Sequence, residues 1–444
     1  MDGDAACSGT APDRSFMNLQ NHIKRWASPL TMMALRVANT GAKFLLALYT
    51  ARYLGLSDLG IYGLLVGGTI LTPAVLGLGT CDWVVRQIVT MSRSDAIAAI
   101  ATRLAQPIVM HAIAQPLLWA LNAALGAPVP WTLVWPCGLI LFLEHVANDA
   151  NDLLIARHRA MLSSVLLFVR SGLWPLAVIV WGALDPAART LECLLAGWIG
   201  GLVILWLVLG AHALVNDRWR FIRLRWRWLL SGVPASWPFY IKDLTAAASL
   251  HLDRFLISMF LGLELTGVYT LFWSITNVAH NLAVYTVVHP QLPTLIATHA
   301  SRDNGAFHAT ERRVRNESIA WAVALAVGAA IAVPILLPYL DRPALQTNLL
   351  TFWIILIATL LRAAADTYGF FLLVLRRDHA IAVISVAGAL GSAALNVLLI
   401  PLFGLPGAAL AYMLTGAGLL AARVWIASDG KARLATPSPQ PAKS

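Results

Sequence analysis

Two cations and two neutral polar side chains form a stripe in the first long apolar segment of the chain. The stripe consists of Arg36, Asn39, Thr40 and Lys43, and the spacing of i, i+3, i+4 and i+7 puts all four on one face of an α-helix. No acidic residue accompanies them. Arg presents a planar fork of donors and Lys a point charge, a combination suited to phosphate or pyrophosphate. The stripe therefore predicts an anionic substrate, held by Arg36, Asn39 and Lys43.

Two other interpretations of this stripe stay open. The cations could pair with acids from the fourth apolar segment, where the candidates are Glu144, Asp149 and Asp152. Arg36 could instead lie near the cytoplasmic end of its helix and extend its charge to the lipid headgroups.

A second polar cluster lies in the fourth apolar segment, Trp131 to Ala156. Nine consecutive residues there include Glu144, His145, Asn148, Asp149, Asn151 and Asp152. A charge at bilayer depth costs about 2.5 to 3.5 kcal/mol, so this cluster must border water or protein. It could relay protons or hold a cation, with Asp149 as the candidate for ion coupling, or it could be a helix end at the cytoplasmic headgroups.

Two further segments carry charges of both signs. In the tenth segment Arg362 and Asp366 are one helical turn apart, and an intrahelical ion pair is the simplest interpretation. In the seventh segment Asp253 and Arg254 precede a glycine motif and could be interfacial. Asp366 is a second candidate for ion coupling, and Arg254 and Arg362 are further candidates for holding the substrate.

The sequence contains no signature of an enzyme or of a metal site. It has no phosphate-gripping glycine loop with Lys, no nucleophile elbow and no HExxH motif, and its four cysteines are isolated. The histidines lack the spacing typical of metal ligands. We therefore predict a protein that is not an enzyme, with no catalytic residues and no metal or other cofactor.

The composition decides the class of protein. Of the 444 residues 59% are apolar and 12% are charged, whereas soluble domains carry about 25% charged residues. Together with a mean hydropathy of +0.71, this predicts an integral membrane protein. The net charge of +10 does not indicate nucleic acid as a partner, because Lys and Arg are concentrated in short gaps between apolar segments, as expected on the cytoplasmic side of a membrane.

Twelve apolar runs are long enough to cross about 30 Å of hydrocarbon as helices. They extend over Pro29–Leu54, Leu59–Gly79, Ala96–Gly126, Trp131–Ala156, Ala160–Ala183, Leu191–Ala211, Ser231–Leu261, Leu265–Pro290, Ser318–Leu340, Leu345–Leu375, Ala380–Ile400 and Leu405–Ile426. Every second connection is basic, while the others contain only Arg189 and Arg342, with Arg52 near a helix end. This alternation predicts an all-α polytopic membrane protein with both termini in the cytoplasm.

One sequence motif occurs twice in similar form. LGLSDLGIYGL at 54–64 returns 207 residues later as LGLELTGVYTL at 261–271, with six of eleven positions identical. Similarity at a long period indicates that one unit is used twice. The shared glycines are Gly55, Gly60, Gly262 and Gly267. At turns between spans glycine permits positive φ and close approach of helices, so we predict a structural or gating role for them.

An even number of spans per unit makes the repeat parallel, with two six-helix lobes around a central cavity. The predicted divisions are a cytoplasmic tail (1–28), the N-lobe (29–212), a basic cytoplasmic linker (213–230), the C-lobe (231–427) and a second cytoplasmic tail (428–444). The linker alternates cations with aromatic residues, in RWRFIRLRWRW, which is typical of an interfacial helix on anionic membrane lipids.

Four stretches of the chain together resemble the polysaccharide and O-antigen flippases of the multidrug, oligosaccharidyl-lipid and polysaccharide exporter superfamily. They are ARYLGLSDLGIYGL from Ala51, LGLGTCDWVVRQI from Leu76, LDRFLISMFLGLELTGVYTL from Leu252 and PLFGLPGAALAYMLTGA from Pro401. The resemblance covers residues 28–427. It implies two six-helix lobes that open alternately to either side and move a polyprenyl-pyrophosphate-linked oligosaccharide across the bacterial inner membrane, for the synthesis of cell-surface polysaccharide such as the O-antigen of lipopolysaccharide.

The resemblance also implies roles for individual residues and leaves rivals open. Cations in the cavity would hold the pyrophosphate, a role that falls to Arg36 and Lys43, and Arg86 matches an arginine whose role is gating, structural or binding. A polysaccharide polymerase complex is a candidate partner. The alternatives are a cation-coupled drug antiporter of the same fold and a membrane-embedded sugar polymerase or ligase. Many such antiporters place an acid in the first helix, where this chain has Arg36 and Lys43, which favours an anionic substrate.

Overall fold

The computed structural model of the chain describes residues 14–124, 130–216, 223–301 and 303–435. These residues form helices joined by short turns, and no strand occurs among them. Parts of both predicted tails, and Arg218 and Arg220 of the predicted linker, lie outside the described residues. The described end of the linker, 223–225, is not helical, and Trp226 already belongs to the next long helix.

The first half of the chain forms six spans. Its helices are α1 (Arg14–Tyr49), α2 (Leu56–Leu76), α3 (Thr80–Ile88), α4 (Arg93–Ala124), α5 (Trp131–Ala156), α6 (Ala160–Phe168), α7 (Trp174–Leu184) and α8 (Leu191–Asn216). A π-helical turn, η1 (Thr50–Leu54), ends the first span, and a second one, η2 (Val169–Leu173), joins α6 and α7 into a single span. A 3₁₀ turn, η3 (Pro186–Ala188), precedes α8.

The second half repeats this plan. Its helices are α9 (Trp226–Leu261), α10 (Leu263–Ala283), α11 (His289–Ala300), α12 (Asn304–Leu340), α13 (Pro343–Thr347), α14 (Leu349–Val374), α15 (Asp378–Phe403) and α16 (Leu405–Ala435). The π-helical turn η5 (Val284–Val288) joins α10 to α11. The protein is thus an all-helical membrane protein with twelve spans in two lobes.

Three of the twelve spans are not identified as membrane spans by length and hydropathy alone. Within the described residues nine helical segments are long and apolar enough to cross a membrane, and these exclude α1, α5 and α10. The exceptions include the two helices that carry the cationic stripe and the fourth-segment cluster. Polar residues within spans usually face a cavity or a protein partner, so these three helices are the first place to look for a site.

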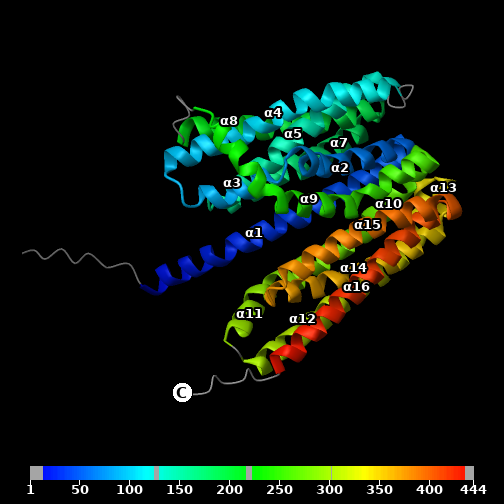
Figure 1. Cartoon of the computed structure of the whole chain (residues 1–444). Coiled ribbons are helices and arrows are strands. Elements are labelled where there is room, and N and C mark those ends of the chain that lie inside the picture. The colour runs from blue at the N-terminus through cyan, green and yellow to red at the C-terminus, as the bar shows by residue number, and fades with distance from the viewer. Residues whose placement is uncertain (1–13, 125–129, 217–222, 302, 436–444) are drawn as a thin grey trace, which may run out of the picture.

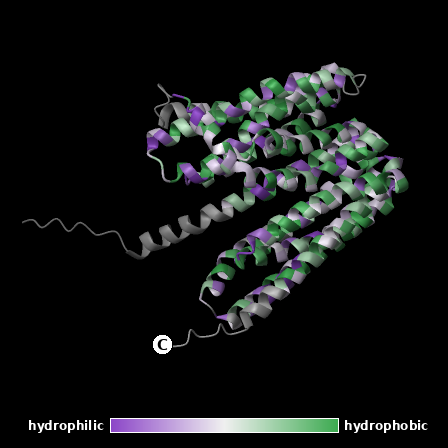
Figure 2. Cartoon of the chain, in the orientation of Figure 1, coloured by the Kyte–Doolittle hydropathy of each residue, from purple (hydrophilic) through white to green (hydrophobic). Residues whose placement is uncertain are grey.

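The two lobes form layers that meet at one end and diverge toward the other (Figure 1). At the closed end, near α13 and the first turns of α2 and α10, one continuous apolar core contains residues of both lobes. At the open end, near α3 and α11, the lobes have separate cores. The start of α1 and the end of α16 lie on this open side, and hydrophilic residues gather mainly there (Figure 2).

The two copies of the repeated motif pack on each other at the closed end. A Cβ at Gly60 would overlap the carbonyl oxygen of Leu263, and a Cβ at Gly267 would overlap that of Leu56. Gly55 and Gly262, at the turns before α2 and α10, have φ of +129° and +85°. The sequence prediction of positive φ and close helix approach is therefore confirmed, and α2 and α10 provide the closest contact between lobes.

A cation from the C-lobe strengthens this closed end. Arg342, in the turn before α13, donates from Nε to the carbonyl oxygen of Ala51 (2.9 Å) and from Nη2 to that of Arg52 (3.1 Å). Carbonyl groups at a helix end lack intrahelical partners and carry partial negative charge, so a guanidinium suits them. The turn before α13 is thereby tied to η1 of the N-lobe.

The helix α9 departs from the predicted division into lobes. By sequence it opens the C-lobe, but its first half packs on α3 and α4, and Leu229 belongs to the apolar core that those helices form with α5. Its second half contacts α2 and α15. A Cβ at Gly79, which has φ of +66°, would overlap the α9 backbone at Ser236 and Tyr240. Glycine at this turn therefore lets α9 reach the N-lobe.

Candidate substrate cavity

The cationic stripe lies on α1, whose ribbon runs between the two layers of helices in Figure 1. Arg36 and Lys43 are exposed and Asn39 is half-buried. Lys43 makes no hydrogen bond or ion pair with another described residue, although Glu144 and Arg170 act on it electrostatically. An exposed ammonium in this position is available to an anion.

The acids of α5 that the sequence offered as partners for α1 have other partners. Glu144 accepts from Trp198 Nε1 (2.7 Å) and forms an ion pair with Arg170 (2.9 Å). Arg170 is carried by the π-helical turn η2. The carboxylate of Asp149 pairs with Arg103 of α4, with 2.8 Å between Nη2 and Oδ1. Neither acid therefore forms an ion pair with Arg36 or Lys43.

A chain of buried polar groups extends from Asp149 between α4 and α5. Oδ2 of Asp149 lies 3.7 Å from His145 Nε2, and His145 Nδ1 lies 3.3 Å from His111 Nε2. Nδ1 of His111 is in turn 3.3 Å from Gln115 Nε2, which donates to the carbonyl oxygen of Gly138 (2.9 Å). Both histidines are buried. The chain begins at a carboxylate and passes through two rings that can each exchange a proton.

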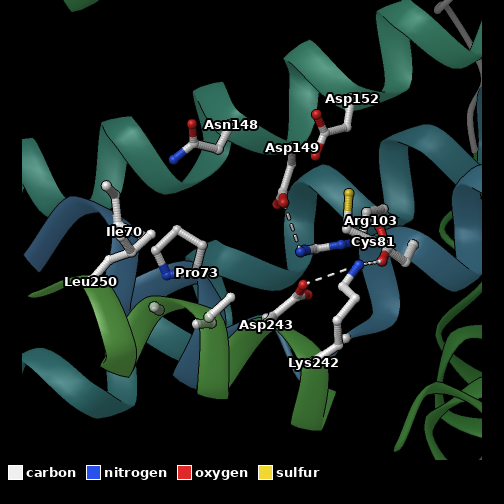
Figure 3. Close-up of a pocket in the computed structure, with 16 residues that line it drawn as sticks. Ile70, Pro73, Cys81, Arg103, Asn148, Asp149, Asp152, Lys242, Asp243 and Leu250 are labelled. Atoms are coloured by element: carbon white, nitrogen blue, oxygen red, sulfur yellow. Dashed lines mark hydrogen bonds and ion pairs between the residues drawn. The ribbon is translucent and has the colours of Figure 1, made fainter. Parts of the chain in front are cut away.

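Asp149 also lines a cavity of about 400 Å³ between α5, the α2–α3 turn and α9 (Figure 3). The charged residues around it are Asp82, Asp149, Asp152, Asp243, Arg103 and Lys242. Lys242 forms ion pairs with Asp82 of α3 and with its neighbour Asp243 (3.3 Å). Four acids and two cations give this cavity a net negative lining, so it does not suit a pyrophosphate.

The C-lobe contains its own ionic cluster, whose members are half-buried. Asp366 pairs with Arg423 of α16 (2.8 Å), with His280 of α10 (3.4 Å) and with Arg362 of its own helix (3.8 Å). The predicted intrahelical pair of Arg362 and Asp366 is confirmed, but it is the longest of the three contacts. Arg362 also lies 5.9 Å from the ring centre of Tyr412. Asp366 therefore joins Arg423 of α16 and His280 of α10 to its own helix.

The interfacial interpretation of Asp253 and Arg254 is wrong. Both side chains are buried, and Arg254 is 1% exposed. The carboxylate of Asp253 accepts from Tyr269 (2.6 Å), while the Arg254 guanidinium lies over Trp273 and contacts His251. Enclosed in this way, Arg254 cannot reach a substrate in this conformation, and its predicted role in binding finds no geometric support.

Arg86 lies at the contact between α3 and α9. Its guanidinium is 4.4 Å from the centre of the Phe239 ring. A cation over an aromatic face contributes about 0.5 to 1 kcal/mol at an exposed site. This placement favours the gating or structural interpretation of Arg86 over a binding role.

Solved structures share the fold of this chain. An inward-facing conformation of a multidrug resistance MATE family transporter of the MOP superfamily matches with a TM-score of 0.68 at 13% identity, covering 89% of this chain and 94% of that chain. An outward-facing conformation of such a transporter matches with a TM-score of 0.60 at 13% identity, covering 92% and 95%. A MOP superfamily transporter from Pyrococcus furiosus, described as having a binding pocket of reverse polarity that suggests a different function, matches with a TM-score of 0.56 at 12% identity, covering 92% and 95%.

These likenesses establish the fold and nothing finer. No protein-family model matches the sequence, and no curated protein does. At this level of identity the two-lobe architecture is shared, while substrate and coupling must be argued from the residues of this chain.

Two functional candidates in the structure were missed by the sequence analysis. Arg103 is a lone arginine seven residues inside the third predicted span, and that isolation was the available signal. Arg342 is one of two cations in connections that otherwise lack them, and each of the two binds a carbonyl group: Arg189 donates to Gly182 (2.7 Å) within the N-lobe, and Arg342 bridges the lobes.

Proposed function

We propose that this protein is an alternating-access transporter that moves a polyprenyl-pyrophosphate-linked oligosaccharide across the bacterial inner membrane. The observation that carries the proposal is Lys43, an exposed ammonium on α1, whose ribbon runs between the two layers (Figure 1), with no carboxylate of the described residues paired to it. A charge-assisted contact from Lys to a phosphate oxygen is about twice as strong as a neutral one.

Three further observations support the proposal. Glu144 and Asp149 form ion pairs with Arg170 and Arg103, so neither of these acids is paired with Lys43. The lobes are joined at one end and separate at the other, as expected of one state in an alternating cycle. The fold is shared by transporters in inward- and outward-facing states. With the basic connections in the cytoplasm, the open end is the cytoplasmic one.

A second candidate function is export of a small cation by the same movement. The observation that favours it is the cavity lined by Asp82, Asp149, Asp152 and Asp243, whose net charge suits a cation. The two candidates therefore assign the substrate to different places: the stripe of α1 or the cavity beside α9.

A binding measurement on the purified full-length protein distinguishes the two candidate functions. It compares undecaprenyl pyrophosphate with neutral undecaprenol. We expect Lys43→Ala to weaken binding of the pyrophosphate lipid about tenfold and to leave undecaprenol unaffected, because only the former contacts the ammonium. Lys43→Arg should preserve most of the affinity.

Lys242→Ala is the matched control, since it removes a lysine from the acidic cavity instead of from α1. It should leave affinity for the pyrophosphate lipid unchanged. Equal affinity of wild type and Lys43→Ala for that lipid, together with loss of binding of a cationic dye in Asp152→Asn, would reject the flippase in favour of the cation exporter.

A further inference from the structure

The Arg103–Asp149 pair depends on a single contact. Arg103 is 1% exposed and Asp149 is 3% exposed. Only Nη2 and Oδ1 are joined; Nε and Nη1 of Arg103 and Oδ2 of Asp149 have no hydrogen-bond partner among the described residues. A buried charge whose partner is neutralised costs several kcal/mol. If Asp149 takes up a proton, Arg103 must therefore find another anion.

The other buried pair of α5 differs in this respect. Arg170 contacts Glu144 and also the amide oxygen of Asn148. Neutralising Glu144 would leave Arg170 with a polar partner in place. Asp149 is thus the carboxylate of α5 whose protonation would release its cation.

Alternative anions for Arg103 line the same cavity. Asp152 lies one turn along α5, and Asp82 is on α3. Asp82 is already engaged, because it holds Lys242 of α9. Figure 3 shows Asp149 pointing toward Arg103 from α5, with Lys242 and Asp243 rising from α9 on the opposite side of the cavity. A guanidinium that turned to Asp82 would compete with Lys242 for the carboxylate.

The α2–α3 turn connects Arg103 to α9 mechanically. Nη2 of Arg103 lies against Gly77, where an added Cβ would be 3.4 Å away, and Gly79 two residues later lies against the α9 backbone. If Arg103 moves, it therefore moves next to the α2–α3 turn, against which α9 packs.

We propose that Asp149 is a proton-binding site that controls the contact between α9 and the N-lobe. Protonation of Asp149 releases Arg103, which moves to Asp82, displaces Lys242 and loosens α9 from α3. The His145–His111 chain supplies a buried route for exchange of the proton. The purpose of the switch, to couple protons to lobe movement, rests on the proposed transport function, but the switch itself does not require a substrate.

The surroundings of Asp149 are compatible with this assignment. The titratable or charged groups that face it are Cys81 and Asp82 on α3, Arg103 and His111 on α4, His145 and Asp152 on α5, and Lys242 and Asp243 on α9. The residues that α2 contributes to the cavity are not ionisable. Arg103 is the only cation of this group bonded to Asp149, so one proton on Asp149 changes the partner of one guanidinium.

The test measures the distance between nitroxide labels attached to unnatural amino acids at Val89, just after α3, and at Trp237 of α9, in the full-length protein that keeps its native cysteines, because Cys81 lines the cavity. Both positions are exposed. As pH falls from mildly alkaline to mildly acidic, we expect the distance to lengthen. Infrared difference spectra of the unaltered chain should show a protonated carboxyl band with the same midpoint, and Asp149→Asn should abolish that band.

Single variants show which residues are responsible for the change in distance with pH. Asp149→Asn should give the long distance at every pH, whereas Arg103→Gln should give the short distance at every pH because no cation competes with Lys242. Lys242→Ala should shift the population toward the longer distance at alkaline pH, and acidification should then change that population little. Glu144→Gln is the matched control and should keep the wild-type pH response.

The proposal is overturned by a distance that does not change with pH, by a pH response or carboxyl band that persists in Asp149→Asn, or by the same change on adding sodium in place of potassium at constant pH. None of these outcomes bears on Lys43 and the pyrophosphate lipid, so failure of the switch and failure of the flippase are separate results.

Discussion

The closed end and the α3–α9 contact hold the same two halves of the chain together by different means. At the closed end the backbones of α2 and α10 meet at Gly60 and Gly267, where no Cβ can be accommodated. At the α3–α9 contact, exposed side chains such as Lys242 and Arg86 reach across to the partner helix. The closed end depends mainly on shape, whereas the α3–α9 contact adds exposed charges to apolar packing around Leu229 and to a close backbone approach at Gly79.

This difference indicates which contact can respond to conditions. Packing of backbones is insensitive to salt and pH and fails steeply when volume is added. Exposed ion pairs contribute about 0 to 1 kcal/mol each and are screened by salt. The closed end should therefore behave as an all-or-none gate, and the α3–α9 contact as an adjustable one.

The strongest test of the comparison is Gly267→Ala. The added methyl would overlap the carbonyl oxygen of Leu56, and overpacking of this kind costs about 1 to 3 kcal/mol or more. We expect labels at Leu184→Cys and Tyr339→Cys, exposed positions on either lobe at this end, to move apart and transport to fall about tenfold or more.

Gly391→Ala is the control for this experiment. A Cβ at Gly391 of α15 meets nothing within 4 Å, so the label distance and transport should match wild type. A closed end that tolerates Gly267→Ala as well as Gly391→Ala would contradict a gate based on backbone contact.

Arg342→Ala should have the next largest effect on the closed end. It removes two hydrogen bonds from a charged donor to Ala51 and Arg52, and such bonds contribute about 1.5 to 3 kcal/mol when buried and less when partly exposed. We expect the fraction of molecules open at this end to rise about fivefold to tenfold in the label-distance distribution. Arg189→Ala, which removes a carbonyl contact within the N-lobe, should leave that distribution unchanged.

A smaller effect is expected for Lys242→Ala at the adjustable contact. The Lys242–Asp82 pair is partly exposed, so its loss should change the population with α9 docked on α3 by no more than about fivefold. In wild type the same contact should loosen as sodium chloride concentration rises, while the distance at the closed end stays constant. Equal salt dependence at both ends would remove the distinction.

The effect of Arg86→Ala should be of the same size as that of Lys242→Ala. Loss of the cation–π contact with Phe239 should shift the docked population about twofold to fivefold, as a contribution of about 0.5 to 1 kcal/mol implies. Arg86→Lys should retain part of the contact. A shift as large as that of Gly267→Ala would mean that Arg86 has a role beyond this contact.

Several parts of the fold could be predicted because their signals are local in sequence. Hydropathy marks the spans, since each must bury its own length in lipid. The paired glycines were identified from the repeat, and their positive φ and close packing follow from the absence of a side chain. The polar residues of α1 and α5 were also visible, because both helices carry charges that lipid does not tolerate.

The candidate site was predicted less completely. The sequence offered Glu144 and Asp149 as partners for α1, but their partners are Arg170 and Arg103, a residue that the prediction did not include. Arg254 was taken as interfacial or substrate-binding, and it is buried against Trp273. Such errors arise because composition reveals that a charge needs a partner without revealing which helix supplies it.

By itself the sequence determined the membrane class, the twelve spans, the doubled unit and the acid-free cationic stripe of α1. These follow from side-chain chemistry and spacing along single helices. Only the tertiary structure decided that the two glycine motifs meet, that α9 rests on the N-lobe and that Asp149 holds Arg103. Those outcomes depend on distances between helices far apart in the chain, and small differences in packing decide which of several chemically suitable partners is within reach.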